Sequence, residues 1–146
     1  MEKKEVHERC ITQVKSNVSE LRRSLSSTNE GFEGSSSAGD KHNTEAAMLH
    51  LEQEKKAAQL EYAVKNLAFL NQIDPLKKCD QIGPGALVQT NKGWFYFAGP
   101  IGKMTIDNET VMVLSVGSPI GRVLSKMKVG ESVCFNKELW VVEGIE

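Results

Sequence analysis

The chain has 146 residues, which is room for about one ordinary domain or two small ones and excludes a large catalytic core. Its 18 Lys and Arg side chains are balanced by 19 Asp and Glu, and a net charge of -1 provides no broad positive field for a nucleic-acid backbone. Stand-alone DNA binding is therefore not expected. Apolar runs such as residues 111–114 are too short to cross a bilayer, and the first residues lack the apolar segment of a signal peptide. We expect a cytoplasmic protein without membrane contact.

The composition changes near residue 74. All four prolines and nine of the twelve glycines follow this position. Because proline breaks helices and glycine marks turns, the first half can be continuous helix and the second should consist of short strands. The sequence predicts an α+β protein in which residues 1–74 form a helical arm, residues 75–82 a linker and residues 83–146 a small β domain.

Apolar residues recur with a helical period in two stretches of the first half. The first stretch is Ile11, Val14, Val18, Leu21 and Leu25; the second is Met48, Leu51, Ala57, Leu60, Val64, Leu67, Leu70 and Ile73. Such seams are typical of supercoiled helices, and the Gly- and Ser-rich residues between them predict a tip loop at about 27–39. Either helix alone would expose its seam, so we expect an antiparallel coiled-coil hairpin. His7 and His50 are expected on solvated helix faces.

The second half predicts about five strands and one short helix. The strands are expected at residues 86–90, 94–98, 110–115, 132–135 and 139–145, with hairpin turns at 91–93 and 136–137. Ser118 and Pro119 predict a helix start, as cap and first-turn residue, before a helix over 120–127.

Four consecutive aromatic residues occupy positions 94–97. In a strand they alternate between the two faces of the sheet, so two should be core and two should point outward. The outward pair can form a partner surface or pack against the base of the arm.

The segment after the third predicted strand resembles a motif of a known family. It reads Ser118-Pro119-Ile120-Gly121-Arg122-Val123-Leu124, followed by Lys128-Val129-Gly130-Glu131. This is similar to the S-P-[LI]-G-x-A-L…K-x-G-[DE] signature of the FKBP-like C-terminal domain of the bacterial Gre transcript-cleavage factors, and the order of parts agrees over nearly the full length. The resemblance implies that the β domain docks on RNA polymerase at the rim of its secondary channel. It also implies that the coiled-coil tip enters that channel, with only indirect contact to nascent RNA.

The residues of this motif have alternative explanations. Ser118, Pro119 and Gly121 can be polymerase-docking residues, or can serve structure alone as cap, first-turn residue and close-packing position. Arg122 can pair with a nearby acid or contact the polymerase, and both alternatives stay open.

At the tip, the family carries a G-D-x-x-E segment whose acids help to hold a second Mg²⁺ at the polymerase active centre. Here Asp40 matches the aspartate, and Asn43 stands where the glutamate is expected. The resemblance therefore implies a metal site shared with the polymerase at Asp40, joined by Glu45 only if the tip is still loop at that residue. Asp40 is equally an ordinary helix cap. Mg²⁺ prefers anionic oxygen ligands, so the amide of Asn43 should hold it less well.

Two other tip residues have a candidate role. His42 is either a ligand or an exposed loop histidine. Phe32 is isolated among Gly and Ser, and it either anchors the tip inside the channel or packs over the end of the hairpin.

No nucleophile–base arrangement, phosphate-binding loop or Cys/His metal cluster is visible in the sequence. We therefore expect no enzyme activity and no intrinsic cofactor; Mg²⁺ and RNA cleavage would belong to the polymerase. The sequence favours a Gre-type transcription elongation factor that acts on backtracked or paused complexes. The alternatives are a Gre-fold modulator or competitor that binds the channel without stimulating cleavage, and a coiled-coil scaffold protein.

Overall fold

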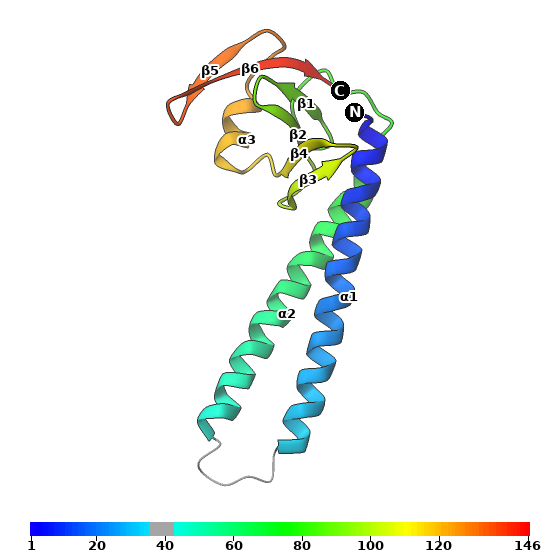
Figure 1. Cartoon of the computed structure of the whole chain (residues 1–146), viewed down its shortest axis with the longest axis vertical. Helices are drawn as coiled ribbons and strands as arrows, with labels where there is room; N and C mark the ends of the chain where they lie inside the picture. Colours follow the sequence, from blue (N-terminus) through cyan, green and yellow to red (C-terminus); the bar gives the residue numbers. More distant parts are fainter. Residues whose placement is uncertain (36–42) are drawn as a thin grey trace. The chain divides into compact units, whose positions relative to one another are not determined.

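Two helices precede a β-sheet with a short helix, as the computed structural model in Figure 1 shows. It describes the backbone of residues 1–35 and 43–146, and the side chains of residues 1–26 and 46–146. The elements are α1 (Lys3–Ser35), α2 (Asn43–Gln72), β1 (Leu87–Thr90), β2 (Gly93–Phe97), β3 (Gly102–Ile106), β4 (Glu109–Leu114), α3 (Pro119–Leu124), β5 (Ser132–Phe135) and β6 (Glu138–Ile145). The α+β class predicted from the sequence is confirmed.

The chain packs as two compact units. One, the helical unit, is Gln13–Leu67; the other, the sheet unit, combines Met1–Thr12 with Ala68–Glu146. This division does not coincide with the boundaries predicted from composition, which place residues 1–74 in the arm. The first turns of α1 and the end of α2 instead pack with the sheet.

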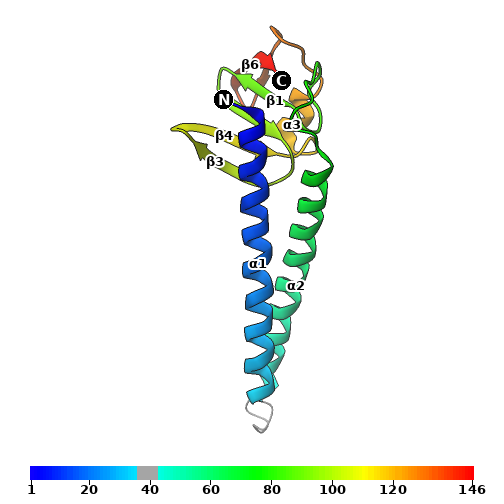
Figure 2. The same cartoon turned by 90° about the vertical axis from the view of Figure 1, so that its right-hand side faces the viewer.

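In the helical unit, α1 and α2 run antiparallel and side by side in both views (Figures 1 and 2). The α1 seam follows the prediction, since Val14 and Val18 are buried and Leu21 and Leu25 are half-buried. On α2 the half-buried positions recur at spacings of three and four. They are Ala46, Leu49, Gln53, Lys56, Leu60, Ala63 and Leu67, and Asn66 beside Leu67 is half-buried as well. Because the described part of this unit contains only these two helices, this set forms the α2 face toward α1.

The seam predicted for α2 is wrong at three of its large residues. Met48, Leu51 and Val64 are 60%, 61% and 40% exposed. Apolar residues lie on more than one side of α2, so the predicted seam begins two residues after the observed set, at Met48 and Leu51, and coincides with it only at Leu60 and Leu67. Periodicity alone does not distinguish them.

α1 also continues farther than expected, to Ser35, ten residues beyond Leu25. The loop predicted at about 27–39 is thus replaced by helix over its first nine residues. Serine costs less than about 0.7 kcal/mol per residue in a helix and glycine about 1 kcal/mol, so a few of them slow but do not stop a helix that is already nucleated.

The sheet unit contains one mixed sheet with the strand order β3-β4-β2-β1-β6-β5. β2 and β4 pair in parallel, and the other neighbours are antiparallel. The predicted strands are confirmed to within one residue at each end, and β3 was missed. β3 is joined to β4 by Asp107 and Asn108, whose φ values of 50° and 66° are those of a two-residue hairpin turn.

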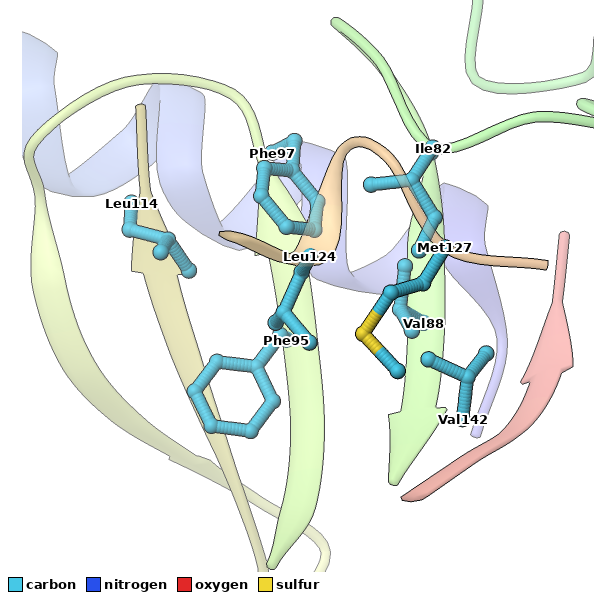
Figure 3. Close-up of a cluster of buried hydrophobic side chains, with 9 residues drawn as sticks. Ile82, Val88, Phe95, Phe97, Leu114, Leu124, Met127 and Val142 are labelled. Atoms are coloured by element: carbon cyan, nitrogen blue, oxygen red, sulfur yellow. The ribbon is translucent and has the colours of Figure 1, made fainter. Parts of the chain in front are cut away.

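One face of the sheet forms the core with α3 (Figure 3). Phe95 and Phe97 of β2 point from this face toward Leu124 of α3. The remaining members of the buried cluster are Ile82, Ala86, Val88, Leu114, Met127 and Val142.

The opposite face of the sheet is covered by the first turns of α1. His7 lies 4% exposed with its Nδ1 2.8 Å from the hydroxyl oxygen of Tyr96, which is fully buried on β2. Cys10 donates to the sulfur of Met104 on β3 at 3.7 Å. The expectation that His7 lies on a solvated face is therefore wrong. Tyr96 belongs to the aromatic pair for which the sequence left open a partner surface or packing against the arm. It packs against the start of α1.

Lys3, at the start of α1, adds hydrogen bonds to the same sheet unit. Its side chain is 7% exposed, and Nζ donates to the main-chain oxygens of Lys77 at 2.7 Å and Glu146 at 3.1 Å. One ammonium group thus joins the start of α1, the segment after α2 and the end of β6.

Burial has an electrostatic consequence for His7. It lowers the pKa of His7 from 6.5, chiefly because desolvation disfavours the imidazolium; a backbone hydrogen bond at Leu70 acts in the other direction. In the folded protein His7 is therefore neutral over a wider pH range than in the unfolded chain.

We predict that the unfolding free energy decreases as the pH falls below 6.5, because the unfolded chain then binds a proton that the folded chain does not. This slope is at most about 1.4 kcal/mol per pH unit for one group. His7→Gln should be less stable than the parent at pH 8, by about 1 to 3 kcal/mol, and the difference should shrink toward pH 5. Urea titrations at pH 8, 7, 6 and 5 measure both profiles. Parallel profiles would show that His7 does not carry the dependence.

Candidate functional site

The candidate docking site is built on α3 and the turn that follows it. Ser118 caps α3 from an extended conformation: its Oγ accepts from the Gly121 N–H at 3.1 Å and donates to the Ser115 carbonyl at 2.8 Å. Pro119 follows at the first position, where a missing N–H costs nothing. The cap predicted from the sequence is confirmed, although α3 ends at Leu124 rather than at residue 127.

Gly121 is required by close packing. A Cβ at this position would lie 2.4 Å from the Ser115 carbonyl oxygen, 2.7 Å from Ser118 Oγ and 2.9 Å from the Val116 carbonyl oxygen. No side chain fits without a shift of the backbone. Ser118, Pro119 and Gly121 thus hold the start of α3 against the end of β4, and any role in docking is carried by the surface that they position.

Arg122 is an exposed member of the motif and carries its only charge within residues 118–124. Within the described side chains, the ion pairs are Lys65–Glu61 and Lys92–Glu138, so Arg122 pairs with no carboxylate there. This disfavours the alternative of surface pairing and leaves the guanidinium available to a partner. Its five donors in a fixed fork suit a bidentate contact to a carboxylate.

The second half of the motif forms a turn. The Lys128 N–H donates to the Glu131 carboxylate at 3.1 Å, the Glu131 N–H donates back to the Lys128 carbonyl at 3.0 Å, and Gly130 has a φ of 88°. The turn exposes Lys128, and Lys126 is exposed just before it. The sequence analysis gave these two lysines no role. The clustering of three cationic residues within seven positions, at 122, 126 and 128, could have indicated a basic surface. The candidate site therefore combines Arg122 with two lysines.

None of the five predicted tip residues has a described side chain. Asp40 and His42 lie outside the described residues. Phe32 lies in α1, and Asn43 and Glu45 lie in α2, but their side chains are outside the described part. Since α2 begins at Asn43, the backbone at Glu45 is helical. The condition under which Glu45 joins Asp40, a loop at this residue, is not met.

The described residues contain no group of three or more His, Cys, Asp or Glu residues that could hold a metal ion. Across the same part of the chain, no helix is long and apolar enough to span a membrane.

Comparison with known proteins gave matches among solved structures. No protein-family model and no curated protein matches the sequence. The chain is similar to the crystal structure of GreA factor homolog 1 of Thermus thermophilus, with 18% identity and a TM-score of 0.35, over 96% of this chain and 94% of that one. A structure described as the transcription factor Gfh1 matches with 17% identity and a TM-score of 0.34, over 94% and 93% of the two chains.

We predict that Gly121→Ala destabilises the sheet unit by about 2 kcal/mol or more, because the added Cβ would overlap two carbonyl oxygens and the cap. Gly117→Ala is the matched control, since its Cβ would meet only Ser115 Oγ, at an ordinary 3.7 Å. Thermal unfolding of the two variants measures the difference. Equal melting temperatures would contradict the close-packing role of Gly121.

Proposed function

We propose that this protein is a Gre-type factor that binds RNA polymerase and places the end of its helical hairpin in the secondary channel. The observation that carries the proposal is the segment Ser118–Glu131. Its sequence resembles the family signature, with Val123 where the signature has alanine, and in the fold it forms a capped helix and turn that present Arg122 without an internal partner. In this proposal the protein is not an enzyme itself, and catalysis belongs to the polymerase.

The helical unit fits the second part of the proposal. Within this unit α1 covers residues 13–35 and α2 residues 43–67, which is 23 and 25 residues, or about 35 Å and 38 Å at 1.5 Å per residue, and the two helices run antiparallel. The segment between them, residues 36–42, contains Asp40. A hairpin of this length and thickness suits a long, narrow channel better than a flat surface.

The residues at the tip allow two versions of the function. In the first, Asp40 shares a Mg²⁺ with polymerase carboxylates, and this ion would polarise the attacking water during RNA hydrolysis. In the second, the hairpin occupies the channel without supplying enough negative charge and competes with cleavage factors. The second version is favoured by Asn43, whose amide replaces the expected carboxylate, and by Lys41 and His42 beside it.

If the α3 site docks on the polymerase, we predict that Arg122→Glu weakens binding to core RNA polymerase by about tenfold or more without lowering the melting temperature. The exposed guanidinium would lose a charge-assisted contact and the new carboxylate would repel an acidic partner. Lys103→Glu, at an exposed position of β3, is the control. Affinities from biolayer interferometry test this. Equal losses for both variants would assign the effect to net charge rather than to the α3 site.

The tip is tested by transcript cleavage on stalled elongation complexes, with the parent, Asp40→Ala and Asn43→Glu. If the parent stimulates cleavage and Asp40→Ala abolishes it, the first version holds. We expect the second version, in which the parent does not stimulate cleavage and Asn43→Glu gains activity, because a second carboxylate improves Mg²⁺ retention. Absence of polymerase binding by the parent would remove both versions.

A further inference from the structure

α2 carries an exposed stripe on the side away from α1. Its members are Met48, Leu51, Lys55, Ala58, Tyr62 and Lys65. Each lies two residues after a member of the half-buried set that faces α1, and two residues on an α-helix correspond to a rotation of about 200°. The two sets therefore occupy opposite faces of the same helix.

The stripe is more apolar than an ordinary solvated helix face. Met48, Leu51 and Tyr62 are 60%, 61% and 56% exposed, and they recur at coiled-coil spacing. Single exposed apolar residues need no explanation, but an aligned set is typical of a surface that pairs with another helix. Nothing else in the described part of the helical unit covers this face.

We propose that the stripe pairs with the stripe of a second copy of this chain, with the two α2 helices antiparallel. The residue order is self-complementary in this arrangement. Met48 meets Lys65 of the second copy, Leu51 meets Tyr62, and the small Ala58 meets Lys55, whose long stem packs on it. No lysine lies directly opposite another lysine, although the two Lys55 residues lie in adjacent layers, about 4.5 Å apart along the helix axis.

The charges beside the stripe fit the same register. Lys55 lies within reach of Glu61 of the second copy, and Lys65 lies within reach of Glu52 of the second copy. Glu54 also approaches Glu61 of the second copy, and the Lys55 ammonium next to them offsets this repulsion. In a parallel dimer, by contrast, Lys55 would face Lys55 and Lys65 would face Lys65, which is unfavourable. Charge complementarity therefore selects the antiparallel pair.

The pairing has a regulatory consequence that rests on the proposed function. The stripe spans residues 48–65, about 27 Å of helix, which is short for a coiled coil, so we expect dissociation constants of about 10 to 100 µM. A dimer joins two hairpins into four helices, which are too thick for a channel that admits one hairpin. Free protein at high concentration would then be held in a form that cannot enter the polymerase.

Analytical ultracentrifugation of the full chain over a concentration series tests the pairing without polymerase. We expect a reversible monomer–dimer equilibrium, and an increase of about a hundredfold or more in the dissociation constant for Leu51→Gln combined with Tyr62→Gln. Val64→Gln, which removes an exposed apolar side chain of α2 outside the stripe, should leave the constant unchanged within about twofold. Far-UV circular dichroism verifies that each variant keeps its helices.

Cysteine cross-linking tests the register in a background of Cys79→Ser and Cys134→Ser, which removes the two thiols that are not buried. A mixture of Leu51→Cys and Tyr62→Cys chains should form the mixed disulfide in preference to either symmetric one. The proposal is overturned if the parent stays monomeric at about 1 mM or if the double variant dimerises like the parent. It is equally overturned if Val64→Gln weakens the dimer as much as the double variant does, or if a symmetric disulfide prevails. A dimer that forms while polymerase binding is absent would leave the pairing intact and remove the proposed function.

Discussion

The contact between His7 and Tyr96 fixes how the start of α1 lies on the sheet, and the sheet unit depends on it. The two side chains join α1 to the central strand β2 at 2.8 Å, and both are nearly inaccessible to water. Burial raises the pKa of the Tyr96 phenol and lowers that of His7, so both groups stay neutral and a charge is kept out of the interior. The sheet consequently has a covered face on each side, with α3 on one and α1 on the other.

The short-range features of the sheet unit could be predicted from the sequence. The cap at Ser118 and the turn at Asn136 depend on a few neighbouring residues, so local chemistry decides them. β3 was missed because Gly102 and Lys103 weaken its strand signal, although Asp107 and Asn108 are residues that favour a hairpin turn. Its strand conformation is imposed by pairing with β4.

Features that depend on distant residues could not be derived in the same way. Nothing near His7 in the sequence shows that a sheet more than eighty residues later will bury it. The α2 face toward α1 includes the polar residues Gln53 and Lys56. A pattern of apolar residues alone therefore does not identify this face. In the candidate site, the motif located Ser118, Gly121 and Arg122, whereas the sequence alone did not show that Lys126 and Lys128 are exposed near them.

The way in which the sheet unit is assembled also determines how it can form. Lys3 binds an oxygen 143 positions away, His7 a residue 89 positions away and Cys10 a residue 94 positions away. Loops of this size must close before the contacts return any free energy, and such topologies fold slowly. The helical unit, whose turns form locally, can assemble first, whereas residues 1–12 can pack only after the sheet has formed. We therefore expect the closure of these long loops, rather than helix formation, to limit the folding rate.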